Sequence, residues 1–256
     1  MVETKRKGAA RVADVPPDIL AQLNAGEIES ATLSESLAID FATLLRSVLP
    51  DLSNKADRID PKDGITKRMS KVAEIIFQAD GLSRLSWLAS HPSDLVRGWG
   101  AYLLALDDQR NLPEQLEAMR PFADDPHFGV REWAWLALRP AVCADPEAAI
   151  SAVTPWTAGA SENIRRFACE AIRPRGVWAS HIKVLKSEPH RGLPVLEPLR
   201  SDPSRYVQDS VANWLNDAWK SQPDWVEGLC ARWSAESDAT ETGYIVKRAL
   251  RNRKKS

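Results

Sequence analysis

The feature that most constrains this fold is a phrase that recurs four times along the chain. Each copy has an aliphatic anchor and a leucine or isoleucine seven or eight residues later, and the first three copies have arginine directly after the anchor. The anchors are Val96, Val130, Ile164 and Val207, with a weaker fifth copy at Ile245. Successive anchors are 34, 34, 43 and 38 residues apart. A period of about 40 residues with helical spacing predicts a solenoid of helix pairs.

Two further columns of the repeat support helices. Three copies carry proline four residues before the anchor, and Asp125 and Asp202 precede two of these prolines, a pairing that suits a helix start and its cap. Four residues after the anchors stand Gly100, Ala134, Ala168, Val211 and Ala249. Mostly small side chains at one position let neighbouring helices approach closely. With no run of alternating β-branched residues, the sequence predicts an all-α protein, a solenoid of HEAT-like helical repeats.

The expected organisation is a basic, disordered tail over residues 1–14 and one repeat domain over 15–256. Before the repeats we expect helices from Pro17, over 33–49, over 66–77 and over 82–89, with a polar break at 51–64. The C-terminal end is basic: from Gly243 onward the chain has no acid and carries Lys247, Arg248, Arg251, Arg253, Lys254 and Lys255.

The composition excludes several classes of protein. No apolar run reaches 18 residues and the first 13 lack the apolar core of a secretory signal, so we expect a cytoplasmic protein that does not span a membrane. The three cysteines are scattered and match no metal spacing, so no metal site is expected. A net charge of −1 argues weakly against nucleic acid, but cations gather within one repeat, at Arg165, Arg166, Arg173 and Arg175.

One constellation is suited to chemistry. Glu170 and Asn213 both stand six positions after their anchors, whereas Pro174 and Asp217 stand ten after. If the two helices lie side by side, both carboxylates meet the segment that leads to Trp178, a tryptophan in a loop. The alternative is structural, with Glu170 in an ion pair to Arg166 or Arg173 and Asp217 in a turn with Asn216. The spacing leaves both open.

The same residues carry a resemblance. Residues 161–178, with Arg165-Arg166, Glu170 and Arg173-Pro174-Arg175 before Trp178, resemble the bacterial AlkC/AlkD-like alkylpurine DNA glycosylases. The likeness is to the AlkC branch without the immunoglobulin-like domain of its longer members. Residues 206–217, with Val-Ala-Asn and Leu-Asn-Asp, are similar to a second motif of that branch, and residues 23–41 and 244–251 look like its first and last helices.

The resemblance implies a repair enzyme, expected to be a monomer, that hydrolyses the N-glycosidic bond of cationic alkylated bases, such as 3-methyladenine, in double-stranded DNA. No cofactor is needed, because alkylation already makes the base a good leaving group. Asp217 would then stabilise an oxocarbenium-like transition state and orient water, Glu170 would assist, and Trp178 would form an aromatic wall. The expected DNA-binding residues are Arg131, Arg166, Arg173, Arg175, Lys247 and Arg251.

The chain also departs from the family's pattern. His127 stands where an acidic residue precedes the Phe-Gly-Val-Arg element, Gly176-Val177 replaces Leu-Pro before the tryptophan, and Trp214 replaces a histidine. Each change weakens the expected contact with DNA. The alternative function is therefore a HEAT-repeat scaffold that binds nucleic acid or protein without catalysis. The preferred lesion and the bending of DNA are left open by the sequence.

Overall fold

The computed structural model describes residues 6–253, and within them every regular element is a helix, which confirms the all-α prediction. Backbone contacts divide the chain into two compact units where one domain was expected. The first comprises residues up to 109 together with 125–137, and the second comprises 110–124 together with 138 onward. Helix α8 (Phe128–Ala144) contributes its first half to the first unit and its second half to the second. No helix of residues 6–253 is long and apolar enough to cross a membrane.

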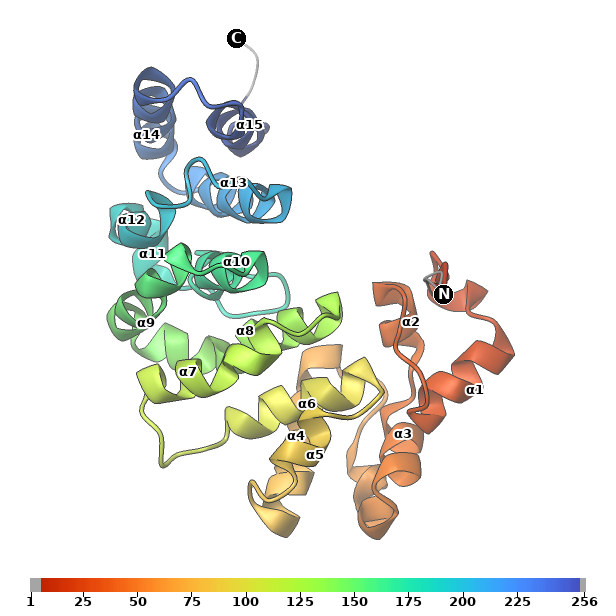
Figure 1. The fold of residues 1–256 in the computed structure, drawn as a ribbon. Helices are drawn as coiled ribbons and strands as arrows, with labels where there is room; N and C mark the ends of the chain where they lie inside the picture. The colour runs from red at the N-terminus through yellow and green to blue at the C-terminus, as the bar shows by residue number, and fades with distance from the viewer. Residues whose placement is uncertain (1–5, 254–256) are drawn as a thin grey trace. The chain divides into compact units, whose positions relative to one another are not determined.

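The first unit holds the N-terminal elements (Figure 1). These are η1 (Val12–Asp14), α1 (Pro17–Ala25), α2 (Leu33–Ala38), α3 (Phe41–Val48), η2 (Pro50–Arg58), α4 (Ile65–Asp80), α5 (Leu85–Ala89) and α6 (Asp94–Leu104). The single helix expected over 33–49 is wrong, because the chain breaks at Ile39. The Asp40 carboxylate accepts the Thr43 amide at 2.6 Å and so caps a new helix, α3.

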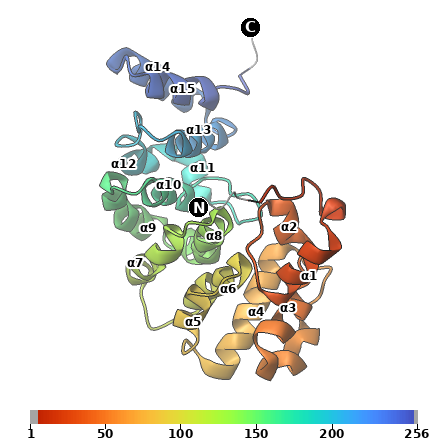
Figure 2. The same cartoon turned by 45° about the vertical axis from the view of Figure 1, so that its right-hand side comes forward.

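The second unit stacks its helices in two rows, with α10, α13 and α15 in one row and α9, α12 and α14 in the other (Figures 1 and 2). Its elements are α7 (Leu112–Ala123), α9 (Pro146–Val153), η3 (Thr154–Ala158), α10 (Glu162–Ala171), α11 (Lys183–Ser187), η4 (Pro189–Gly192), α12 (Leu193–Leu196), α13 (Arg205–Trp219), α14 (Pro223–Glu236) and α15 (Thr240–Ala249). Helices α10 and α13 pack together, as do α13 and α15. Pairing of successive repeats is therefore observed where the period predicts it.

The repeat columns form the cores of both units. All five anchors are buried, and so are the small residues four positions later. Close helix approach is clearest at Gly98 of α6, where a Cβ atom would lie 2.6 Å from the Trp133 ring and 2.7 Å from the Met69 methyl. A side chain at position 98 would therefore require Trp133 or Met69 to shift.

The arginine after each anchor has a structural role. Arg97, Arg131 and Arg165 each donate from Nη1 to the carbonyl oxygens five and six residues earlier, at 2.6–3.0 Å. In the fourth copy, Gln208 donates to the carbonyl six residues earlier at 2.8 Å. The repeated arginine therefore clamps the loop that leads into its own helix, which satisfies carbonyls that helix geometry cannot reach.

The aspartates of the repeat hold turns instead of capping the helix at proline. The helices begin two residues after Pro126 and Pro203, and the carboxylates of Asp125 and Asp202 accept the amides two residues on. Asp125 also accepts from Arg97, and Asp202 from Arg165, each through two hydrogen bonds. Arg97 and Arg165 are thereby each bound to the aspartate that begins the next repeat.

Part of the expected disordered tail is ordered. Arg6 donates to both oxygens of the buried Glu35 carboxylate at 2.6 Å, and the Ala9 amide donates to the same group at 3.0 Å. The hydrogen bond from Arg6 lowers the pKa of Glu35 to about 2, against the opposing effect of burial. Residues 6–14 thus pack on α2 because α2 presents a buried carboxylate that needs a cation. Residues 1–5, and Lys254 and Lys255 of the basic end, lie outside the described residues.

Candidate functional site

The candidate site lies in the second unit, where the last turn of α10 packs against α13 between Ser210 and Asp217. Helix α10 begins at the Ser161 cap and buries one face through Ile164, Phe167 and Ala168. Its other side brings Glu170 toward α13, while the chain leaves the helix through Arg173. Local helix chemistry thus delivers an acid and a base to the same end of α10.

Glu170 is a buried carboxylate, only 2 % exposed, with three partners. It accepts from the Ser210 hydroxyl at 2.8 Å and from Arg173 at 3.0 Å, and Arg166 lies 3.6 Å away. Burial would raise the pKa of the Glu170 carboxyl, but the charges of Arg166 and Arg173, with the hydrogen bonds that Ser210 and Arg173 donate to it, hold the pKa below its ordinary value. The ion pairs considered as the structural alternative are confirmed. The expected neighbour Asn213 is replaced by Ser210, one turn earlier on α13.

Asp217 is 5 % exposed and is ionically paired on both oxygens. Its Oδ2 accepts from Arg173 at 2.6 and 3.2 Å, and its Oδ1 accepts from Lys220 at 2.8 Å. Arg173 thus bridges the two carboxylates. Burial would lower the pKa of Arg173, yet Glu170 and Asp217 together raise it well above its ordinary value. The turn expected between Asp217 and Asn216 is absent, since the Asn216 amide instead donates to the Ala249 carbonyl at 2.7 Å.

The loop between α10 and α11 carries an exposed aromatic side chain, that of Trp178. Trp178 is 52 % exposed, in agreement with its prediction as a loop tryptophan. Its φ of 57° lies in the left-handed region, which residues other than glycine rarely adopt. The Ile182 amide closes the loop by donating to the Pro174 carbonyl at 3.1 Å. An exposed indole on a strained backbone within a closed loop is typical of a binding element.

The loop is joined to Asp217 by its own arginines. Arg173 holds the carboxylate, and Arg175 donates to the Asp217 carbonyl at 3.3 Å and to the Ser221 hydroxyl at 2.6 Å. Arg173 stands five residues before Trp178, and Arg175 stands three before it. The predicted grouping of Glu170, Asp217 and the Arg173–Arg175 segment is therefore present in the structure, and Trp178 lies in the same loop.

The other predicted DNA-binding residues of this unit differ in exposure. Arg166 is mostly buried and its guanidinium lies 4.3 Å from the centre of the Tyr206 ring. Arg251 and Lys247 are exposed on and beyond α15, and Arg251 donates to the Asn213 side chain at 3.1 Å. Of the three, Arg251 and Lys247 present the most accessible charge.

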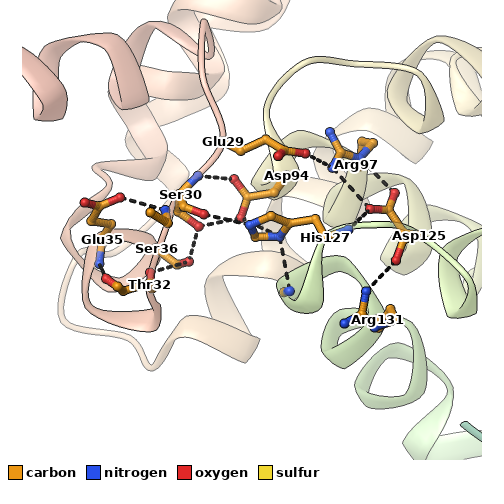
Figure 3. A network of polar contacts seen from close by, with 12 residues as sticks. Glu29, Ser30, Thr32, Glu35, Ser36, Asp94, Arg97, Asp125, His127 and Arg131 are labelled. Atoms are coloured by element: carbon orange, nitrogen blue, oxygen red, sulfur yellow. Dashed lines mark hydrogen bonds and ion pairs between the residues drawn. The ribbon is translucent and has the colours of Figure 1, made fainter. Parts of the chain in front are cut away.

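Arg131 belongs to the first unit, within the polar network of Figure 3. It clamps the Asp125 and Pro126 carbonyls. His127, which departs from the family's pattern, is buried there: its Nε2 lies 2.7 Å from the Ser30 carbonyl, its Nδ1 accepts the Gly129 amide at 3.1 Å, and its ring stacks on Phe128 at 4.6 Å. A cavity of about 350 Å³ adjoins this network, with Arg6, Glu29, Ser30, His127, Phe128 and Arg131 in its lining.

Three residues of the site were not predicted from the sequence. Ser210 and Lys220 hold the two carboxylates, and Arg139 holds the Trp178 loop through its Ala171, Arg173 and Ser180 carbonyls. Lys220 was detectable, since a cation three residues after an acid on a helix is a standard pair. Residues 6–253 contain no group of three or more His, Cys, Asp or Glu side chains arranged to hold a metal ion.

Comparisons with known proteins place this geometry in context. No family model matches the chain. An uncharacterized protein of Bacillus subtilis (strain 168), YhaZ, is 34 % identical over 231 residues, which is 85 % of this chain but 62 % of YhaZ. The chain thus spans less than two thirds of that relative.

Two solved structures are similar over most of the chain. The alkylpurine DNA glycosylase AlkC of Pseudomonas fluorescens, bound to DNA containing an abasic site analog, superposes with a TM-score of 0.65 at 24 % identity, over 82 % of this chain and 60 % of AlkC. AlkD2 of Streptococcus mutans superposes with a TM-score of 0.62 at 22 % identity, over 78 % of this chain and 96 % of AlkD2. The chain therefore has the AlkC/AlkD fold, which confirms at the level of fold the resemblance drawn from the motifs.

Proposed function

We propose that this chain belongs to the AlkC/AlkD-like family and acts as a DNA glycosylase that hydrolyses the N-glycosidic bond of cationic alkylated bases in double-stranded DNA. The observation that carries the proposal is the paired cluster of Glu170, Arg173 and Asp217 at the base of an exposed tryptophan loop. This cluster occurs on a fold shared with a DNA glycosylase. The motifs that carry the resemblance are the same residues that form the cluster.

The chemistry suits these groups. An alkylated base such as 3-methyladenine is already a cation and leaves as a neutral molecule, so positive charge develops on the deoxyribose as the bond breaks. A carboxylate close to that sugar stabilises the charge electrostatically and orients the attacking water. Arg173 fixes the Asp217 carboxylate in place, and Glu170 fixes Arg173 in turn. The face of Trp178 attracts cations by about 0.5–2 kcal/mol.

The Lys220 partner of Asp217 gives the site a way to open. Its side chain is 45 % exposed, whereas that of Arg173 is 15 % exposed. A DNA phosphate that approaches the loop would compete for the Lys220 ammonium, and Oδ1 of Asp217 would then face the substrate. Arg175, Arg251 and Lys247 would hold neighbouring phosphates, since phosphate contacts position a duplex without reading its sequence.

A second function is a DNA-binding scaffold without catalysis. The observation in its favour is that both oxygens of Asp217 are already paired with cations. Arg166, Arg173, Arg175 and Lys220 outnumber the two acids of the cluster, a balance that favours phosphate over a cationic base. The two functions share the DNA and differ in whether Asp217 acts on it.

The test is release of bases from duplex DNA that carries 3-methyladenine or 7-methylguanine, under single-turnover conditions. We expect release by the wild-type protein and a loss of at least about 10²-fold in Asp217→Asn, because the carboxylate charge is removed without changing its shape. The matched control is Asp224→Asn, which alters an exposed carboxylate at the start of α14 and is expected to leave release unchanged.

Binding measurements separate the two functions. Both predict an affinity for DNA that falls steeply with salt. Salt-dependent binding without base release by the wild type would establish the scaffold, and equal release by wild type and Asp217→Asn would remove Asp217 from the mechanism. A flat salt response would contradict both functions.

A further inference from the structure

Arg139 is a buried cation to which the proposed chemistry assigns no role. It lies in the second half of α8 and is 1 % exposed, so it cannot touch DNA. Its guanidinium donates to three carbonyl oxygens: that of Ser180 at 2.8 Å, that of Ala171 at 3.1 Å and that of Arg173 at 2.5 Å. A buried guanidinium is costly to desolvate unless it is hydrogen-bonded, and these three bonds offset that cost.

The three carbonyls bracket the loop of Trp178. Ala171 is the last residue of α10 and Arg173 stands two residues later, while Ser180 lies two residues beyond Trp178. One side chain therefore ties the two ends of the loop together. The carbonyls at the end of α10 have no partners within the helix, and a cation at a helix C-terminus interacts favourably with the helix dipole.

Arg139 occupies a column of the repeat that reaches forward to the next repeat. Arg139, Arg173 and Asn216 each stand nine residues after their anchors. Arg139 donates to the backbone of Arg173, the side chain of Arg173 donates to Asp217, and Asn216 donates to the Ala249 carbonyl at the end of α15. Arg139 is therefore connected to both carboxylates of the candidate site through the backbone of Arg173.

We propose that Arg139 is a positioning residue, which fixes the loop of Trp178 and the backbone of Arg173 so that the indole and the Arg173–Asp217 pair keep their geometry. The proposal rests on the function proposed above for this site. Its physical basis is that one rigid, planar donor group meets both ends of the loop, a task that a lysine ammonium with three short-range donors performs less well.

The experiment uses the full chain with Arg139→Met, which keeps the length of the side chain but removes its donors, and Arg139→Lys, which keeps the charge. The matched control is Arg165→Met, which removes a clamp on a different loop together with the ion pair to Asp202. Hydrogen exchange is followed at the Ile182 amide, whose bond to the Pro174 carbonyl closes the Trp178 loop. Excision is measured in a single turnover, DNA affinity by anisotropy, and the helical content of every variant by circular dichroism.

We expect exchange at Ile182 to accelerate at least about 10-fold in Arg139→Met, and less in Arg139→Lys, because local opening sets exchange rates. The excision rate should fall about 10- to 100-fold in Arg139→Met, since small misplacements of catalytic groups have effects of this size, while the dissociation constant for DNA changes less than about 3-fold. Arg165→Met should leave both the Ile182 exchange and the excision rate of the folded protein unchanged.

Two outcomes would overturn the proposal. Unchanged exchange at Ile182 in a folded Arg139→Met or Arg139→Lys would show that the loop does not depend on Arg139. Faster exchange with an unchanged excision rate would show that the site does not depend on the loop. Absence of excision by the wild type would refute the proposed function instead. In that case the emission of Trp178 is measured as the difference in fluorescence between a protein with Trp178 and its Trp178→Phe variant. Loss of this difference when Arg139→Met is introduced would still support loop positioning. Retention of the difference would refute it.

Discussion

Two polar networks, one in each compact unit, use similar side chains in different ways. The network of Figure 3 in the first unit joins Ser30, Asp94, Arg97, Asp125 and His127, all buried, largely through bonds to backbone groups. The site cluster in the second unit joins Glu170, Arg173 and Asp217, but it ends in the exposed Lys220 and adjoins the exposed Trp178. We call the first network closed because its buried carboxylates, Asp94 and Asp125, accept from the buried Ser30, Arg97 and His127, although Glu29, which also pairs with Arg97, is exposed. The second is open because the buried Asp217 accepts from the exposed Lys220, a partner that a ligand can replace.

The difference follows from where each network lies on its helix. The repeat arginines Arg97, Arg131 and Arg165 donate to carbonyls of the loop that precedes their own helix. The site residues Glu170 and Arg173 lie at the C-terminal end of such a helix, where a long loop follows. The last carbonyls of a helix have no partner within it and can accept hydrogen bonds from other groups. The structural clamps therefore lie at the N-terminal ends of helices, whereas the candidate catalytic residues lie near the C-terminal end of α10.

The largest expected effect tests the closed network. Arg97→Ala removes the cation that pairs with Asp125 and Glu29 and the clamp on the loop before α6. Because this leaves Asp125 buried without its cation, we expect the free energy of unfolding to fall by about 3–5 kcal/mol. Chemical denaturation measures the loss. A decrease below about 1 kcal/mol would show that the network of Figure 3 is not closed in the sense used here.

The fold was largely predictable because its signals are local and repeated. Anchors, small residues and prolines recur at fixed positions, and the anchors and the small residues are buried in the structure. The break at Ile39 was missed because apolar residues on both sides keep helical spacing, and only the Asp40 cap decides between one helix and two. The order of residues 6–14 was missed because its cause, the buried Glu35, lies over 20 residues away.

The site was predictable only in part. Register alone brought Glu170, Asp217 and Arg173 together, since α10 and α13 are neighbours. Arg139 gave no signal because its partners are carbonyls, which every residue has. Arg131 was grouped with the DNA-binding residues on its charge, but charge does not reveal that its Nη1 already serves two carbonyls. Contact of Arg131 with DNA remains a prediction.

A pH-dependent effect tests whether the first unit depends on an ionised carboxylate. The pKa of Glu35 lies near 2, below its ordinary value, because Arg6 bonds to it. The ionised group therefore stabilises the fold above about pH 4.5, and this stabilisation is lost as the pH falls toward 2. We expect Glu35→Gln to lower the free energy of unfolding at pH 7 by at most about 3 kcal/mol, the value that corresponds to a pKa lowered from 4.5 to about 2.

The control for this prediction is the shape of the pH profile. Between pH 4.5 and 2 the unfolding free energy of the wild type should fall more steeply than that of Glu35→Gln, because the variant has no proton to take up at this position. Parallel profiles would mean that Arg6 and Glu35 do not form the pair in solution.

A smaller effect tests strain in the open region. Trp178→Ala and Trp178→Gly both delete the indole and differ only in the backbone preference at a φ of 57°. We expect the glycine variant to be more stable than the alanine variant by about 1 kcal/mol, since L-residues pay roughly that for the left-handed region. Thermal and chemical unfolding of the two variants give the difference directly. Equal stabilities would remove backbone strain from the account of the loop.

The smallest effect on stability tests whether the site cluster can release a partner. Lys220 pairs with Asp217 through a side chain that is 45 % exposed, so Lys220→Ala should change the free energy of unfolding by less than about 0.5 kcal/mol. Its effect should instead be seen in DNA binding. If a phosphate replaces Asp217 as the partner of Lys220, the variant loses one phosphate contact, and the slope of log affinity against log salt becomes shallower by about one. Arg97→Lys, which alters only the closed network, should leave that slope unchanged. A large loss of stability in Lys220→Ala with an unaltered slope would show that Lys220 belongs to the structure, and that the cluster around Asp217 is as closed as its counterpart in the first unit.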